Sequence, residues 1–120
     1  MDSLYEHGAL AIDRSLRTGA HGLPLMGTGD WNDGMNRVGH EGRGESVWLA
    51  WFLCEVVRVY LPLARARRDG GRVAAWEQAR NGWIDALESD GWDGSWYRRA
   101  FFDDGSVLGS ASNVEGRIDL

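Results

Sequence analysis

The chain has 120 residues with 13 basic and 18 acidic side chains, and its formal net charge is −5. This acidic balance argues against nucleic-acid binding, which requires a basic surface. All 13 basic residues are arginine, so Schiff-base, pyridoxal-phosphate and P-loop chemistry lack the lysine they need. The single cysteine, Cys54, excludes an internal disulfide and a thiolate zinc site.

Glycine and tryptophan are unusually frequent, with 17 and 7 residues. Glycine bends the backbone sharply or lets it lie close to a neighbour, and tryptophan supplies large flat apolar faces. The combination suggests loops around a ligand with flat faces, such as a sugar. A small tryptophan-rich core is the alternative interpretation.

The first part of the chain predicts a helix followed by a long loop. A helix is expected over 3–18, with Ser3 as its N-cap and Glu6 completing a capping box. Residues 19–45 contain eight glycines and Pro24, which no helix tolerates. Because this stretch also contains apolar residues such as Trp31, we expect an ordered, functional loop.

A second helix is expected over 46–68, with Ser46 as its N-cap. Its first two turns, 47–54, are apolar all round, which predicts burial on all sides, although this run is too short to span a bilayer. Pro62 should kink or end the helix, and the glycine pair 70–71 should stop it.

A third helix is expected over 72–89, followed by a β-hairpin with a turn at 103–105. Alternation along the first strand points Arg98 and Arg99 to opposite faces. The inward arginine would need a partner, either a buried carboxylate or a ligand.

The densest polar cluster is Asp30-Trp31-Asn32-Asp33. Cleavage of a glycosidic bond needs a carboxylic acid with a raised pKa to protonate the leaving oxygen. The apolar face of Trp31 and the charge of Asp30 would raise the pKa of Asp33. The indole can stack on a sugar ring while Asp30 and Asn32 bind hydroxyls. Local turns and caps are the alternative use of such residues.

Metal sites are less consistent with the pattern. A calcium loop that begins at Asp30 fails because Gly34 and Met35 occupy its fifth and sixth positions. The three histidines also lack metal-ligand spacing. The segment 40–46 precedes a helix N-terminus, where Arg43 could bind phosphate. Alternatively, Glu45 only caps that helix and Arg43 is solvated.

Two stretches resemble a known family. Residues 21–35, HGLPLMGTGDWNDGM, and 44–48, GESVW, are similar to the inverting disaccharide phosphorylases of glycoside hydrolase family 94. Residues 35–39 and 96–105 look most like the branch that acts on β-1,2-glucans, which includes the C-terminal phosphorylase-like domain of cyclic β-1,2-glucan synthases.

The resemblance implies that 1–120 is a fragment of a single (α/α)6-barrel catalytic domain, mainly α, with a long catalytic loop and a C-terminal hairpin. It implies that Asp33 is the general acid, that Trp31 lines the donor-sugar subsite and that inorganic phosphate is the nucleophile. No other cofactor and no metal is needed. As substrate-binding residues we add Asp30, Asn32, Glu45 and Arg99, and Arg43 for phosphate.

Two alternatives stay open: an inverting hydrolase on the same scaffold, with Glu45 or Glu115 as base, and a non-catalytic carbohydrate-binding or structural helical segment. Expected partners are an oligosaccharide, phosphate and the rest of the parent chain, with a homo-oligomer left open. No signal peptide is visible at the polar N-terminus, so we expect a cytoplasmic location, with a parent that could be tethered to the inner membrane. We expect the fragment alone to be inactive.

Overall fold

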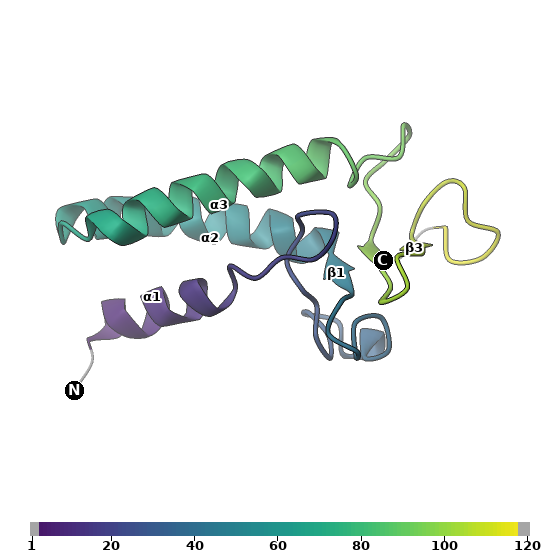
Figure 1. Cartoon of the computed structure of the whole chain (residues 1–120), viewed down its shortest axis with the longest axis horizontal. Coiled ribbons are helices and arrows are strands. Elements are labelled where there is room, and N and C mark those ends of the chain that lie inside the picture. The colour runs from purple at the N-terminus through teal and green to yellow at the C-terminus, as the bar shows by residue number, and fades with distance from the viewer. Residues whose placement is uncertain (1–2, 118–120) are drawn as a thin grey trace.

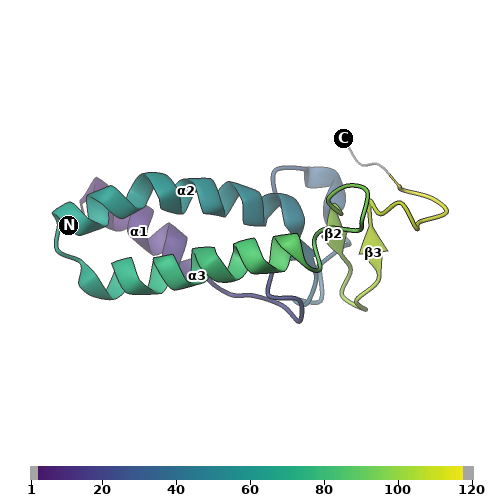
Figure 2. The same ribbon diagram turned by 90° about the horizontal axis from the view of Figure 1, so that it is seen from above.

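A computed structural model describes residues 3–117, and the side chain of Asp33 lies outside the described part. The structure is mainly helical, as expected. Helices α2 (Val47–Ala66) and α3 (Gly70–Glu88) lie side by side, and α1 (Leu4–Arg14) lies against one end of them (Figures 1 and 2). The expected barrel is not visible, since residues 3–117 contribute only these three α-helices and one short 3-10 helix.

Helix α1 begins as predicted and ends early. Ser3 Oγ accepts a hydrogen bond from the backbone N–H of Glu6 at 3.1 Å, which is the predicted N-cap. The helix ends at Arg14, four residues before the predicted end. Residues beyond it already belong to the loop, because the N–H of Leu25 donates to the carbonyl oxygen of Arg17.

Helix α2 also begins as predicted, since Ser46 Oγ accepts from the N–H of Leu49 at 2.9 Å. Pro62 does not end it, and the helix continues to Ala66. The expectation that the glycine pair 70–71 stops this helix is wrong, because both glycines lie in the first turn of α3. Arg68, with φ of 56°, makes the turn between the two helices instead.

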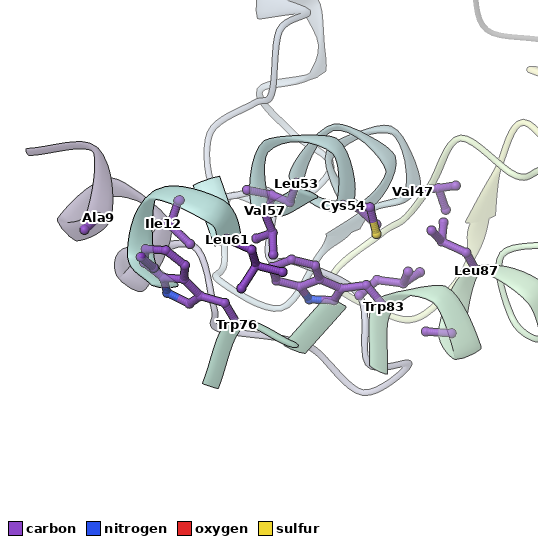
Figure 3. Close-up of a cluster of buried hydrophobic side chains, with 14 of the residues drawn as sticks. Ala9, Ile12, Val47, Leu53, Cys54, Val57, Leu61, Trp76, Trp83 and Leu87 are labelled. Atoms are coloured by element: carbon purple, nitrogen blue, oxygen red, sulfur yellow. The ribbon is translucent and has the colours of Figure 1, made fainter. Parts of the chain in front are cut away.

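The main core lies between α2 and α3 (Figure 3). Trp76 and Trp83 of α3 are buried against Val57 and Leu61 of α2, and Ile12 of α1 extends the same cluster. Each buried large side chain of this kind stabilises the fold by roughly 1.5–3 kcal/mol. The α2–α3 pair is therefore the scaffold on which the loops rest.

One face of α2 is exposed, so the expected burial on all sides is not found among residues 3–117. Trp51, Phe52, Val59 and Leu63 are 41%, 50%, 53% and 49% exposed. By length and hydropathy the whole of α2 could cross a membrane. The apolar run 47–54 alone, on which the sequence prediction depended, is too short to do so. A core helix passes the same test, and α2 buries its other face against α1 and α3.

A three-stranded antiparallel sheet stands at the other end of the helices. Strands β2 (Ala100–Phe101) and β3 (Val107–Leu108) form the predicted hairpin, shorter than expected. The third strand, β1 (Glu45–Ser46), was not predicted and pairs with β2. The loop between α1 and β1 is ordered, as predicted, and contains one short 3-10 helix, η1 (Asp33–Met35).

Candidate active site

Asp30 lies at the buried centre of the loop between α1 and β1. Arg99 Nη2 donates to Asp30 Oδ1 at 2.8 Å, and Arg99 Nη1 lies 2.8 Å from Oδ2. The Asp30 side chain is 0% exposed and that of Arg99 is 10% exposed. Ser46 Oγ donates to Oδ2 at 2.7 Å, and the N–H of Asn32 donates to Oδ1 at 3.1 Å. This carboxylate therefore joins the loop, β1 and the start of the hairpin.

The charge state of Asp30 follows from these contacts. Burial alone would raise its pKa, but the hydrogen bonds from Arg99, Ser46 and the Asn32 backbone outweigh burial, and the net effect lowers the pKa. Asp30 is therefore ionised near neutral pH and cannot act as a proton donor there.

Glu45 is the second buried carboxylate, and it is 1% exposed. Its Oε2 accepts from the backbone N–H groups of His21 at 3.1 Å and Leu23 at 2.9 Å, and its Oε1 lies 2.6 Å from His21 Nδ1. The His21 ring stacks on Phe101 with ring centroids 3.9 Å apart. Glu45 and its neighbour Ser46 thus bind on opposite sides of β1, as alternation along a strand requires.

The turn that follows Asp30 presents an aromatic ring to solvent. Trp31 is 57% exposed, and its ring centroid lies 6.0 Å from that of Trp48 at the start of α2. Asn32 Oδ1 accepts from the N–H of Gly34 at 2.9 Å and so caps η1. Asp33 is the first residue of η1. Its side chain lies outside the described part of the structure, so its role as general acid stays a prediction.

A cavity of about 420 Å³ lies next to Trp48 and Arg99, which contact Trp31 and Asp30. Its walls come from the first turns of α2, from the segment before β2 and from the chain after β3. It is lined mainly by aromatic and arginine side chains: Val47, Trp48, Trp51, Trp96, Tyr97, Arg98, Arg99, Gly109 and Arg117. Arg99 therefore contributes both to this wall and to the Asp30 pair.

Arg43 and Glu45 border a different cavity, of about 440 Å³, together with His21. The Arg43 guanidinium donates to Glu41 Oε2 and to the carbonyl oxygen of Asp103. Glu115 is exposed in the segment after β3. The structure thus brings Asp30, Trp31, Asn32 and Arg99 together and places Arg43, Glu45 and Glu115 elsewhere.

Two further carboxylates that the sequence did not single out hold loops in place. Asp103 accepts the backbone N–H groups of Glu41, Arg43 and Gly44 at 2.8–2.9 Å. Asp93 accepts those of Ser95, Trp96 and Ala111. For Asp93, the backbone hydrogen bonds from Trp96, Ala111 and Ser95 lower the pKa. The aspartate-glycine turn at Asp103 was visible in the sequence, but not its contacts some sixty residues away.

Comparison with known proteins places the chain in a family. The sequence model of the glycosyl hydrolase 94 superfamily catalytic domain matches residues 1–120, so the chain belongs to this family of carbohydrate-active enzymes. This confirms the resemblance.

In the described residues, no group of three or more histidine, cysteine, aspartate or glutamate side chains could hold a metal ion.

Its relatives are a glucan synthase and glycoside phosphorylases. The chain is 59% identical over 117 residues to cyclic beta-(1,2)-glucan synthase NdvB of Rhizobium meliloti, covering 97% of the chain and 4% of that protein. It is 39% identical to 3-O-beta-D-glucopyranosyl-beta-D-glucuronide phosphorylase of Paenibacillus borealis, over 98% of the chain and 16% of that protein. It is 31% identical to N,N'-diacetylchitobiose phosphorylase of Vibrio furnissii, over 98% and 15%. The chain thus spans only a small part of these relatives.

Proposed function

We propose that the chain is part of an (α/α)6-barrel catalytic domain that cleaves β-glucosides of the β-1,2-glucan type by inverting phosphorolysis. The family match, which covers the whole chain including the Asp33 loop, carries this proposal. The names of the relatives support it, because phosphorylases and a β-1,2-glucan synthase share this stretch of sequence. The substrates of the whole protein are then a β-linked oligosaccharide and inorganic phosphate.

In the proposed reaction Asp33 donates its proton to the glycosidic oxygen, which leaves with the electron pair of the broken bond to the anomeric carbon. A phosphate oxygen attacks the same carbon from the opposite face and forms the new bond. The configuration inverts, and the product is α-glucose 1-phosphate. Phosphate is already an anionic nucleophile, so no second carboxylate is needed as a base.

The environment of Asp30 supports this division of roles. Hydrogen bonds from Arg99 and Ser46 keep the buried Asp30 side chain ionised, so it is unsuited to donate a proton or to bind a sugar hydroxyl directly. This supports the proposal that Asp33, to which the family resemblance gives the role, is the acid of this motif. We propose that Asp30 and Arg99 act by holding the loop, while exposed Trp31 provides the apolar face for the donor sugar.

The proposal can be tested with the longest natural protein that contains this chain. A β-linked glucose disaccharide is incubated with and without phosphate, and the sugar products are followed by NMR. Phosphorolysis predicts α-glucose 1-phosphate only when phosphate is present. Release of free glucose without phosphate would instead identify a hydrolase, and absence of turnover would favour a binding or structural role.

Two variants sharpen this test. Asp33→Asn removes the proposed acid, and its turnover should fall by roughly 10²–10⁴-fold, the usual contribution of general acid catalysis. Asp85→Asn makes the same chemical change at an exposed position of α3 and should match the native protein. Equal activity of the two variants would remove Asp33 from the mechanism.

A further inference from the structure

The stretch of chain around β2 holds the loop between α1 and β1 on both sides of η1. The hairpin and this loop lie at the same end of the helices (Figures 1 and 2). Before β2, Arg99 pairs with Asp30, which precedes η1. After β2, Asp103 accepts hydrogen bonds from the backbone of the loop between 41 and 44, which follows η1. The short helix that begins with Asp33 is therefore attached from both sides.

The second of these attachments depends on the Asp103 carboxylate, whose side chain is only 9% exposed. Its Oδ2 accepts from the N–H of Glu41 at 2.9 Å, and its Oδ1 accepts from the N–H groups of Arg43 at 2.8 Å and Gly44 at 2.9 Å. His40 Nδ1 lies 3.4 Å from Oδ2. Burial alone would raise the pKa of Asp103, but the backbone hydrogen bonds outweigh burial, and the net effect lowers the pKa. Both oxygens are thus available as acceptors near neutral pH.

Two further hydrogen bonds connect this attachment to η1. The N–H of Asp103 donates to the carbonyl oxygen of Val38 at 3.0 Å, and the N–H of Val38 donates to that of Met35 at 3.3 Å. Met35, the last residue of η1, is buried with Val38 and with Ala100 of β2 in a cluster separate from the main core. Because η1 is a single turn that begins at Asp33, a shift of Met35 also moves Asp33.

Removal of the Asp103 carboxylate should change the place of the loop more than the stability of the domain. Glu41 and Arg43 are exposed, so water can bind their freed N–H groups, and only Gly44 is buried. A displacement of about 1 Å at a reacting group can cost about 10²-fold in rate. We infer that Asp103 is a positioning residue that holds η1, and with it Asp33, at the glycosidic bond, an inference that rests on the proposed function.

The test uses the longest natural protein that contains the chain and two substrates, with phosphate present. A β-linked glucose disaccharide needs a proton on its leaving group, whereas a dinitrophenyl β-glucoside does not. Asp103→Ala should lower kcat/KM about 10²-fold for the disaccharide and leave the dinitrophenyl glucoside nearly as reactive as with the native protein. Asp103→Asn keeps an acceptor oxygen for Arg43 and Gly44 and should lose less on the disaccharide. The control, Asp104→Ala, removes the next carboxylate, which binds Ser106 within its own turn, and should match the native protein on both substrates.

The outcomes separate this inference from the proposed function. No loss on the disaccharide in Asp103→Ala, or equal losses on both substrates in Asp103→Ala and Asp103→Asn, would overturn the positioning role. If Asp33→Asn cleaves the disaccharide as fast as the native protein, the proposed function fails instead. Hydrogen exchange measured by mass spectrometry then still decides whether Asp103 holds η1. Faster exchange over 34–44 in Asp103→Ala than in Asp104→Ala supports the attachment, and equal exchange in the two variants overturns it.

Discussion

Asp30 and Arg99, which are 69 positions apart in the chain, form a bidentate ion pair that is almost completely buried. Through Ser46, the same carboxylate reaches the N-cap of α2. One side chain thus fixes the candidate catalytic loop to the helix pair and to the hairpin. The position of the loop therefore depends on tertiary contacts rather than on local turn preference.

Arg99→Met should destabilise the domain strongly, because it leaves the Asp30 carboxylate buried without its cationic partner. Breaking a buried pair in this way costs about 3–5 kcal/mol. Denaturant unfolding of the protein that contains the chain, followed by tryptophan fluorescence, measures the loss. Arg58→Met is the control, since the Arg58–Glu55 pair is exposed on α2 and should contribute little. Similar losses in both variants would refute the structural role of Arg99.

Stability should fall on acidification partly through Asp30. The folded state lowers the pKa of Asp30, so the unfolded chain takes up the proton more readily. The stabilisation is complete above the ordinary aspartate pKa of about 4 and is lost as the pH falls through the lowered folded value. Asp30→Asn should therefore be less stable at neutral pH and lose less stability between about pH 6 and about pH 3. Melting temperatures of the native protein and of Asp30→Asn, measured across that pH range, test this. An equal fall of the melting temperature in both proteins would contradict it.

Glu45→Ala should loosen the 19–23 segment, since it leaves the N–H groups of His21 and Leu23 without their acceptor. Each buried unsatisfied donor costs about 1–3 kcal/mol. Limited proteolysis, with cleavage sites read by mass spectrometry, should show faster cutting in this segment. Glu77→Ala removes an exposed carboxylate of α3 and serves as the control. Equal protection in both variants would contradict the role given to Glu45.

Two glycine substitutions should have opposite effects. At Gly44 a Cβ atom would lie 2.5 Å from the Val38 carbonyl oxygen and 2.5 Å from Gly39 Cα, so Gly44→Ala must displace the backbone of the loop. At Gly82 in α3 nothing lies within 4 Å, and Gly82→Ala should stabilise the helix by about 0.5–1 kcal/mol. Melting temperatures that move in the same direction would contradict this packing.

Sequence reasoning was most accurate where the signal is local. The caps at Ser3 and Ser46 and the turn between β2 and β3 each depend on a few adjacent residues, and the structure contains all three. Strand β1 was missed because two residues carry no periodicity, and it exists only through pairing with β2. The early end of α1 has the same origin, since tertiary hydrogen bonds take up the residues after Arg14.

The candidate site also depends on contacts that no local pattern shows. The sequence indicated Asp30 and Arg99 as separate site residues, and it left open whether an inward arginine would pair with a carboxylate or with a ligand. In the structure the partner of Arg99 is Asp30. The apolar start of α2 suggested burial all round, yet Trp51 and Phe52 are exposed. Among residues 3–117, Tyr97 covers only part of that face by packing edge-on against Trp51, and no local pattern could show which side would stay exposed.

The proton-donor role of Asp33 is tested most directly by the choice of leaving group. Asp33→Asn and the native protein are compared, with phosphate present, on a β-linked glucose disaccharide and on a dinitrophenyl β-glucoside, whose leaving group departs without protonation. The account predicts a loss of roughly 10²–10⁴-fold on the disaccharide, with the dinitrophenyl substrate nearly as reactive as with the native protein. An equal loss on both substrates, or no loss on either, would contradict it.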